Sequence, residues 1–465
     1  MRKSAISRVI VFYDISLQYA FFDVCRWDEN SLQVRERASF LMLAAKLLAF
    51  GYSGVRQLTI WRPNHMRKIW ETAIHCGLRK RSPVAASLLL AAISVPAQTP
   101  SVVKDATVYN RPVLLVGNDK LEVAIVKQGG SMLRIQIQGD PQGISPFGNP
   151  ELVPSVPDNR KLNGPMVGHF VCVDGFGPPS KEEAAAGLAM HGEAYLQPWK
   201  LVSAEKQDGV ATVKFTVDLP KFQETFARSL QMVDGENVIY VDSELTSNTA
   251  FDRTANWGEH PFLFPPFVER GNTVVDVSGV RSKTRTYPAN TRPGTLLKQS
   301  QDFTWPKAPG AGGADFDVRE TPTELNGMGH TTTLMDPSHP LAWVTVLNKA
   351  RHYLLGYVFR REEYPWVQNY MQYSGSGWIG RGVEFATQPF DLSHRDMVEL
   401  NRMFDTPVYR WLPAKSKIGT RFLLFYAKSP EGMTRVDDVR LENGKLIVED
   451  RASGKTMTLA ASRPL

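Results

Sequence analysis

Cysteine is scarce in this sequence, which excludes several kinds of site. The 465 residues include three cysteines, Cys25, Cys76 and Cys172. If the chain is cleaved after Ala97, as argued below, only Cys172 remains, and one thiol can form neither an internal disulfide nor a zinc site made of cysteines. Cys172 lies in the apolar segment HFVCVDGFG, so we expect it to be buried and unreactive.

Basic residues show no excess over most of the chain, although the formal net charge is +7. Residues 1–97 hold 14 Lys and Arg against 6 Asp and Glu. Of the 54 basic and 47 acidic residues in the whole chain, 40 and 41 therefore lie beyond residue 97. A body so close to neutral gives no electrostatic reason to expect a nucleic acid as partner.

Long helical periodicity is missing after residue 100. Apolar residues alternate there in short runs separated by turn signals, which is typical of antiparallel strands. The clearest turns are the pairs Gly129-Gly130, Asp208-Gly209, Asp234-Gly235, Asn443-Gly444 and Ser453-Gly454. One short helix is expected in SKEEAAAGLAM, where Ser180 and Glu183 form a capping box. With no clear linker in residues 98–465, the pattern predicts one all-β domain, a large antiparallel β-sandwich.

The start of the chain is typical of a targeting region. The segment RKRSPVAASLLLAAISVPAQTP has a basic start, an apolar run too short to span a bilayer, and small residues before Ala97. We therefore expect residues 66–97 to be a secretory signal peptide cleaved after Ala97, with residues 1–65 as a doubtful N-terminal extension. The alternative is a genuine N-terminal helix, because VRERASFLMLAAKLLAFGY is amphipathic. Export predicts a periplasmic or secreted protein, free of the membrane after cleavage.

Three short segments combine ionisable, glycine and aromatic residues in a way that suits a sugar site. They are AMHGEAYLQPW (189–199), NWGEHPFLFPPF (256–267) and GRGVEFATQPFD (380–391). Each places one ionisable residue beside glycine or at a strand end, where the backbone can approach a ligand closely. Aromatic side chains nearby are of the kind that stack on the faces of sugars.

In this order, the three segments resemble those of the aldose 1-epimerase family, whose members have the galactose mutarotase-like fold. His191, with a glycine after it and Trp199 further on, is similar to the family's His-Gly motif. His260, with Phe262 two residues later, is similar to the family's catalytic histidine turn, and Glu384 is similar to its catalytic glutamate. The resemblance covers roughly residues 107–430 and implies a β-sandwich enzyme of the isomerase class.

The resemblance implies that sugar anomers are interconverted by acid/base ring opening, without a metal or a cofactor. It makes Glu384 the base, His260 the acid and His191 a group that binds a hydroxyl or polarises the ring oxygen. The partner would be a monosaccharide or a related carbohydrate. The family's Gly-Arg-x-x-Asn-Arg segment corresponds here to MVGHFVCVDGFG, which has no arginine and offers His169 and Asp174 instead.

Further sugar contacts are expected near these positions. Trp257 and Gln388 lie close in sequence to the two catalytic candidates, and Asp315 and Asp317 are candidates for the family's substrate-binding aspartate. Four aromatic residues could form a platform for the sugar, although the core of the sandwich is the better expectation for most of them: Trp366, Tyr370, Tyr373 and Trp378.

Other interpretations stay open. A histidine on a strand is more often a hydrogen-bonded structural residue than a catalyst, and strand alternation could leave Glu384 exposed beside Arg381 as an ordinary surface pair. The fold could also belong to a carbohydrate-binding protein that has lost catalysis, or to a lyase or glycoside hydrolase. Hydrolysis normally needs two carboxylates, and only one has support from the sequence.

Motifs of other enzyme classes fail on their context. GSGWIG (375–380) matches a dinucleotide-binding pattern, but the segment after it is typical of a strand and not of the required helix. QYSGSG lacks the first glycine of a serine-hydrolase elbow. The other histidines considered show no spacing typical of metal ligands: His330, His339, His352 and His394.

Overall fold

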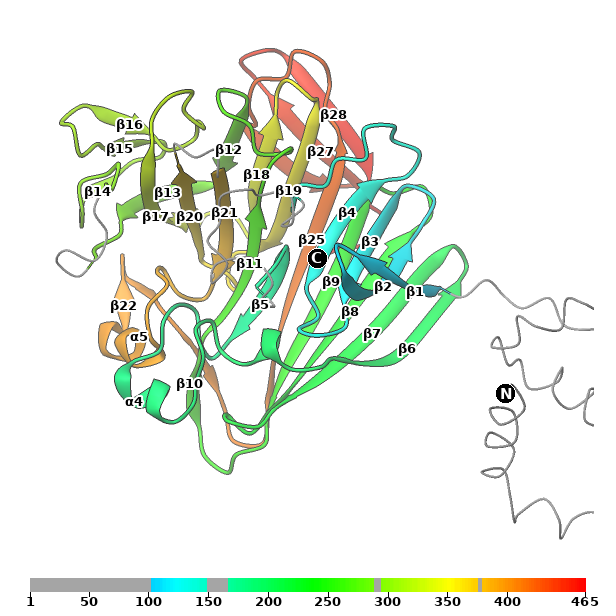
Figure 1. Ribbon diagram of the computed structural model, residues 1–465, viewed down its shortest axis with the longest axis vertical. Helices are drawn as coiled ribbons and strands as arrows, with labels where there is room; N and C mark the ends of the chain where they lie inside the picture. The colour runs from blue at the N-terminus through cyan, green and yellow to red at the C-terminus, as the bar shows by residue number, and fades with distance from the viewer. Residues whose placement is uncertain (1–101, 149–165, 288–293, 375–378) are drawn as a thin grey trace, which may run out of the picture. The chain divides into compact units, whose positions relative to one another are not determined.

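The computed structural model describes residues 102–148, 166–287, 294–374 and 379–465, which belong to one compact unit from Gln98 to Leu465 (Figure 1). The predicted signal peptide, the N-terminal extension, Cys25, Cys76 and Trp378 lie outside the described residues. Within the described part of the chain, no helix is long and apolar enough to cross a membrane.

Two large antiparallel sheets make up most of this unit. The eleven-stranded sheet has the order β1 (Val103–Val108), β2 (Arg111–Gly117), β3 (Leu121–Val126), β4 (Met132–Ile137), β5 (His169–Val173), β11 (Trp257–Leu263), β21 (Ile379–Ala386), β20 (Trp366–Tyr373), β17 (Gly327–Met335), β13 (Gly279–Thr284) and β14 (Asp302–Phe303). The eight-stranded sheet has the order β12 (Thr273–Val277), β18 (Leu341–Asn348), β19 (Tyr353–Arg360), β25 (Lys417–Lys428), β9 (Val238–Ser247), β8 (Glu224–Val233), β7 (Val210–Leu219) and β6 (Lys200–Gln207). These sheets confirm the predicted all-β class.

Smaller elements complete the unit. Two-stranded sheets pair β10 (Arg253–Ala255) with β24 (Arg410–Leu412), β15 (Lys307–Pro309) with β16 (Asp315–Asp317), and β22 (Arg402–Met403) with β23 (Thr406–Pro407). A three-stranded sheet contains β26 (Asp438–Glu442), β27 (Lys445–Asp450) and β28 (Lys455–Ala460). The described helices are α4 (Lys181–Ala185), the 3₁₀ turn η5 (Ala194–Leu196) and α5 (His394–Leu400).

The turn signals in the sequence fall where the chain reverses. The five predicted turns connect β3 to β4, β6 to β7, β8 to β9, β26 to β27 and β27 to β28. Helix α4 begins at the predicted capping box, because the Ser180 hydroxyl accepts a hydrogen bond from the Glu183 amide at 3.2 Å. The Glu183 carboxylate accepts one in return from the Ser180 amide at 2.6 Å.

The core lies between the two large sheets. Every second side chain of β8 is buried, as expected for a strand with one face on a core. Buried residues of both sheets form one apolar cluster, which includes Leu263 and Phe385 from the eleven-stranded sheet and Leu230 and Phe422 from the eight-stranded sheet. Each sheet therefore has one face toward the core and one face away from it.

The C-terminal sheet covers part of the outer face of the eight-stranded sheet (Figure 1). Leu446 and Met457 from this sheet belong to a second apolar cluster with Trp343, Leu354 and Phe425 of the eight-stranded sheet. Because these side chains are buried, the three-stranded sheet is an integral part of the unit and not a separate domain.

Candidate active site

The candidate site lies on the face of the eleven-stranded sheet that points away from the core. On β11 and β21, the odd-numbered residues Leu263, Val383 and Phe385 belong to the core cluster. Because successive side chains of a strand point to opposite faces, the even-numbered residues His260 and Glu384 point to the outer face. Strand alternation thus places both catalytic candidates on the same side of the sheet.

Strand register arranges this face in rows of side chains. One row crosses β5, β11, β21, β20 and β17 through Phe170, His260, Glu384, Gln368 and Thr332. The next row crosses β11, β21, β20 and β17 through Phe262, Gly382, Tyr370 and His330. In the row on the other side of the first, Leu334 and Trp366 pack against Met397 of α5, which covers the sheet there.

His260 and Glu384 contact each other within the first row. Nε2 of His260 lies 3.5 Å from Oε1 of Glu384. The imidazole stacks on the Phe170 ring, with centroids 4.3 Å apart and an angle of 19° between the planes. The two side chains are 11% and 4% exposed, so the pair is shielded from bulk water but can still be reached.

Gly382 makes room for the Glu384 carboxylate. A Cβ atom at Gly382 would lie 2.4 Å from Oε1 of Glu384, which is closer than non-bonded atoms can approach. It would also lie 3.1 Å from Cβ of Tyr370. The absence of a side chain at this position therefore lets the carboxylate lie flat against β21, on the side of the second row.

Burial removes charge from both members of the pair. Desolvation raises the pKa of Glu384 well above its ordinary value, and the negative charge of Asp391 raises it further. Desolvation likewise lowers the pKa of His260 well below its ordinary value, and His191 adds to this effect. Burial therefore favours the form of the Glu384–His260 pair that is neutral overall and holds one proton.

His191 approaches this pair from a separate loop. Its ring centroid lies 4.9 Å from that of His260, and the two planes are nearly perpendicular, at 86°. Its backbone amide donates to the Gly177 carbonyl at 2.9 Å, and its Nδ1 accepts from the Gly177 amide at 3.1 Å. Burial lowers the pKa of His191 to about 4. The ring is thus neutral near pH 7 with its proton on Nε2, which makes Nε2 a hydrogen-bond donor.

A third histidine and an aspartate, to which the sequence gave no role, complete the site. Nδ1 of His330 lies 3.1 Å from Oδ1 of Asp391, and Nε of Arg285 contacts the same oxygen. Arg285 also donates from Nη2 to the Asp391 carbonyl at 2.6 Å. Burial opposes the charged form of Asp391, but His330 and Arg285 outweigh it and lower the pKa of this carboxyl. Asp391 is therefore a carboxylate between two nitrogen donors.

Several buried polar atoms in this region have no hydrogen-bond partner among the described residues. They are His260 Nδ1, Gln368 Oε1, Thr332 Oγ1, His330 Nε2 and Gln388 Oε1. Buried polar groups are normally paired, so a group of unpaired ones indicates a place where water or a polar ligand binds. Most of these atoms accept hydrogen bonds, and sugar hydroxyls can donate to them.

Two predicted sugar contacts, His169 and Trp257, lie on the wrong face of the sheet. Both are fully buried between the sheets, where His169 Nε2 lies 3.0 Å from the Glu259 carboxylate and Trp257 Nε1 donates to it at 3.3 Å. Arg228 also pairs with Glu259, at 2.5 Å. The expectation that His169 and Trp257 contact a sugar is therefore corrected, because strand alternation turns both side chains into the core.

The predicted acidic contacts are engaged elsewhere. Asp174 is buried and pairs with Arg253 at 2.5 Å. Asp317 pairs with Lys307 at 2.9 Å on the small sheet that also contains Asp315. Gln388 lies closer to the site, since the Gln368 side chain donates to its carbonyl at 3.3 Å. Of the predicted polar contacts among the described residues, His191 and Gln388 therefore lie near the catalytic candidates.

The positions of the described aromatic residues and of Glu384 bear on the alternatives for them. Tyr373 is fully buried in the core between the sheets, and Trp366 is fully buried in the apolar cluster beneath α5, whereas Tyr370 is half-buried and lies in the second row of the site. Arg381 is buried as well and donates to the Val318 carbonyl at 2.9 Å. Because both Arg381 and Glu384 are buried, they do not form an exposed surface pair.

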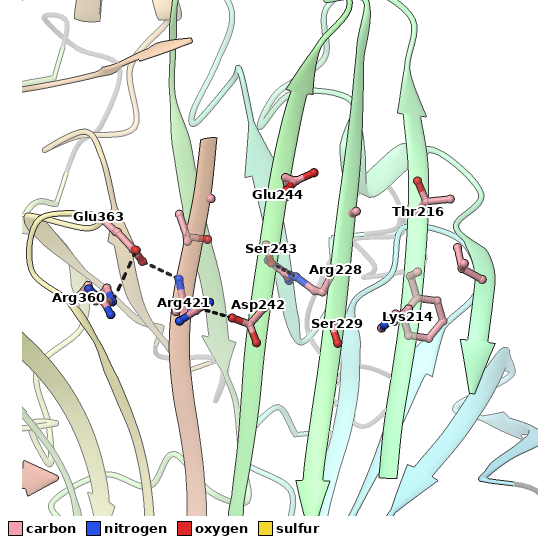
Figure 2. A pocket seen from close by; sticks show the side chains of 15 residues that line it. Lys214, Thr216, Arg228, Ser229, Asp242, Ser243, Glu244, Arg360, Glu363 and Arg421 are labelled. Carbon is pink, nitrogen blue, oxygen red and sulfur yellow. Dashed lines mark hydrogen bonds and ion pairs between the residues drawn. The ribbon is translucent and has the colours of Figure 1, made fainter. Parts of the chain in front are cut away.

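The described residues offer little support for other kinds of site. No group of three or more His, Cys, Asp or Glu side chains in the described part of the chain is placed to hold a metal ion. A cavity of about 780 Å³ lies on the eight-stranded sheet (Figure 2), and none of the described histidines lines it. Charged residues there pair with each other: Arg421 lies 2.6 Å from Asp242, and its amide donates to Glu363 at 2.6 Å.

Comparison with solved structures supports the fold, whereas comparison by sequence finds no match. No family model and no curated protein matches the sequence. A galactose mutarotase-like protein of Clostridium acetobutylicum is similar in structure, with a TM-score of 0.50 and 11% identity over 71% of this chain and 100% of that one. A galactose mutarotase-like protein of Lactobacillus casei has a TM-score of 0.45 and 12% identity, over 68% of this chain and 100% of that one. A galactose mutarotase related enzyme of Lactobacillus acidophilus has a TM-score of 0.46 and 12% identity, over 70% of this chain and 99% of that one.

These findings define the class of the protein by its architecture. The chain has the galactose mutarotase-like fold, with large antiparallel sheets as in the Clostridium acetobutylicum protein. The resemblance that the sequence predicted is therefore confirmed at the level of structure, in a divergent form. At 11% identity the likeness establishes the fold alone.

Proposed function

We propose that the protein interconverts the anomers of a monosaccharide or a related carbohydrate, with Glu384 and His260 as the proton-transfer pair. One observation carries the proposal: His191, His260 and Glu384 come from distant segments and meet on one face of the sheet. The unpaired buried polar atoms beside them suit a ligand rich in hydroxyl groups.

The single proton of the Glu384–His260 pair provides both an acid and a base. When the proton moves from the carboxyl to Nε2 of His260 across the 3.5 Å contact, Glu384 becomes a carboxylate and His260 an imidazolium. The carboxylate takes the proton of the anomeric hydroxyl, and the imidazolium protonates the ring oxygen as the bond between that oxygen and the anomeric carbon breaks. Rotation of the open-chain aldehyde and reclosure by the reverse transfers give the other anomer.

His191 has a supporting role in this mechanism. Its Nε2–H can donate to a substrate oxygen, and the ring is held in place by the two hydrogen bonds to Gly177. A neutral donor stabilises developing negative charge on that oxygen without repelling the His260 imidazolium.

A carbohydrate-binding protein on the same fold is the second candidate. It is favoured by the burial of Glu384, which raises the pKa of this carboxyl, because a protonated carboxyl cannot act as a base. The absence of an arginine from MVGHFVCVDGFG favours it as well. In this case the site would hold a sugar through hydrogen bonds and leave its anomers unchanged.

Exchange NMR at anomeric equilibrium separates the two candidates. An enzyme produces exchange cross-peaks between the α- and β-anomeric protons of galactose, glucose, xylose or arabinose at mixing times where the sugar alone produces none. A binding protein broadens the sugar signals without such cross-peaks. Cross-peaks that persist in Glu384→Gln would contradict the assignment of Glu384.

A further inference from the structure

His330 has the surroundings of a functional histidine, although its sequence context did not distinguish it. It is buried, with 4% of its side chain exposed, and its Nδ1 faces the Asp391 carboxylate at 3.1 Å. A carboxylate behind one ring nitrogen keeps the proton on that nitrogen, which leaves a lone pair on the other. Nε2 of His330 is therefore an acceptor, and it has no hydrogen-bond partner among the described residues.

The Asp391 carboxylate is itself held rigidly. Arg285 contacts its Oδ1 through Nε and its carbonyl through Nη2. A Cβ atom at Gly177 would lie 2.3 Å from the Asp391 carbonyl carbon, so the two loops are in close contact. Gly177 also binds His191 through two hydrogen bonds. One packed unit thus orients both His191 and the His330–Asp391 pair.

His330 lies beside the catalytic candidates at a suitable distance for a sugar ring. It is opposite Tyr370, which is opposite Gly382 on β21, in the row next to that of Glu384. Neighbouring strands are about 4.8 Å apart, so two strand spacings place its backbone roughly 10 Å from β21. Its ring is perpendicular to the Tyr370 ring, with centroids 5.8 Å apart, on the same half-buried face.

We propose that His330 determines sugar specificity by accepting, through Nε2, a hydrogen bond from a sugar hydroxyl other than the anomeric one. Asp391 and Arg285 act as positioning residues that fix its ring and its tautomer. This inference rests on the proposed function, because it assumes that a sugar is bound between His330 and the Glu384–His260 pair.

Two substitutions at His330 test the contact. His330→Asn keeps a donor toward Asp391 but removes Nε2, whereas His330→Gln retains a polar atom near the Nε2 position. We expect His330→Asn to lower kcat/KM for the preferred sugar about tenfold, as for the loss of one hydrogen bond, and His330→Gln to restore most of it. With the monodeoxy sugar that lacks the contacted hydroxyl, His330→Asn and wild type should have equal kcat/KM.

Matched controls separate this effect from general damage. His339 is an exposed histidine that also faces an aspartate, with Nδ1 3.3 Å from Asp336, so His339→Asn should leave kcat/KM unchanged. Asp391→Asn should reduce the discrimination between the parent and deoxy sugars, as His330→Asn does. Equal losses in His330→Asn on the parent sugar and on every deoxy analogue would overturn the proposal.

The proposed contact at His330 can also be tested if the protein proves not to be an enzyme. If wild type accelerates no anomer exchange, the proposed function fails, and the same variants are titrated calorimetrically with the four sugars. A weaker affinity in His330→Asn that His330→Gln restores would still support the contact. Affinities identical to wild type in both variants would overturn it.

Discussion

The buried Glu384 carboxyl has a cost for the fold as well as a role in the proposed chemistry. Burial raises the pKa of Glu384, so the folded state disfavours the ionised carboxylate. The free energy of unfolding is therefore highest below the ordinary pKa of 4.5 and falls as the pH rises from there through the raised pKa. Glu384→Gln removes this titration. We expect the melting temperature of the variant to exceed that of wild type by a margin that grows above pH 4.5, as measured by calorimetry from pH 4 to pH 9. A constant difference across this range would contradict the assigned burial.

The shared proton of the Glu384–His260 pair predicts an unusual pH dependence of activity. Only the form of the pair with one proton supplies both the acid and the base. This form exists over a pH range whose upper limit is the raised pKa of Glu384 and whose lower limit is the lowered pKa of His260. The rate of anomer exchange should therefore fall as the pH rises through the upper limit. A rate that increases through pH 4.5 and then stays constant at alkaline pH would indicate a simple carboxylate base instead.

Gly382 offers a test of the geometry that leaves every polar group in place. In Gly382→Ala, the new Cβ would lie 2.4 Å from Oε1 of Glu384 and must displace the carboxylate. A displacement of about 1 Å can cost on the order of 10²-fold in rate, so kcat should fall by that order. Gly380→Ala is the matched control on the same face of β21, because its nearest contact is 3.4 Å from the Phe262 ring. Similar losses in both variants would contradict the specific role of Gly382.

At the residue scale, the sequence pointed to part of the candidate site. His191, His260 and Glu384 could be found because each lies in a short segment with a family resemblance. His330 and Asp391 could not, because only the folded chain brings Asp391, which follows β21, to within 3.1 Å of His330 on β17. His169 and Trp257 were wrongly assigned since NWGEHPFLF and HFVCV show no alternation of polar and apolar residues that would reveal the buried face.

At the scale of elements, a buried ionic network joins the two large sheets. Arg228 of β8 pairs with Glu259 of β11 at 2.5 Å, and His169 of β5 pairs with the same carboxylate at 3.0 Å. Burial opposes the charged form of Glu259, but Arg228 and His169 outweigh it and lower its pKa. Because strand alternation places Glu259 on the face opposite His260, this network supports the site from behind.

The network predicts a large effect from the loss of one charge. Arg228→Met leaves the Glu259 carboxylate without its main partner, so the free energy of unfolding should fall by about 3–5 kcal/mol. Arg421→Met is the control, since Arg421 pairs with Asp242 on the exposed wall of the cavity in Figure 2 and should cost about 0–1 kcal/mol. Urea denaturation of both variants measures the difference. Equal losses would contradict the view of a network that joins the sheets.

The elements themselves were predictable to different degrees. Strands and hairpins could be located because residue pairs that end in glycine mark the turns between runs of alternating apolar and polar residues. Asn443-Gly444 is an example, and both of its residues have positive φ. Helix α5 was not predicted, although Ser393 caps it by accepting a hydrogen bond from the Asp396 amide at 3.1 Å. Its seven residues have one buried side chain, Met397, so no helical periodicity could be detected.

At the scale of the whole molecule, the compact unit begins where the predicted signal peptide ends. The unit runs from Gln98 to Leu465, and cleavage is expected after Ala97. When the chain from Met66 is expressed in a bacterium with a periplasm, we expect the mature protein in the periplasm or medium to begin at Gln98. N-terminal sequencing and mass spectrometry measure this directly. Protein that stays in the cytoplasm and retains residues 66–97 would contradict the proposed export.

The central claim is that Glu384 and His260 open and reclose a sugar ring. Polarimetry on freshly dissolved α-anomers of galactose, glucose, xylose and arabinose tests it most directly, with wild type and Glu384→Gln compared at equal concentration. We predict that wild type speeds the approach to equilibrium rotation for at least one sugar and that Glu384→Gln loses about 10²–10⁴-fold of this rate. Acceleration that is equal in both proteins, or absent with every sugar while binding is still detected, would contradict the claim.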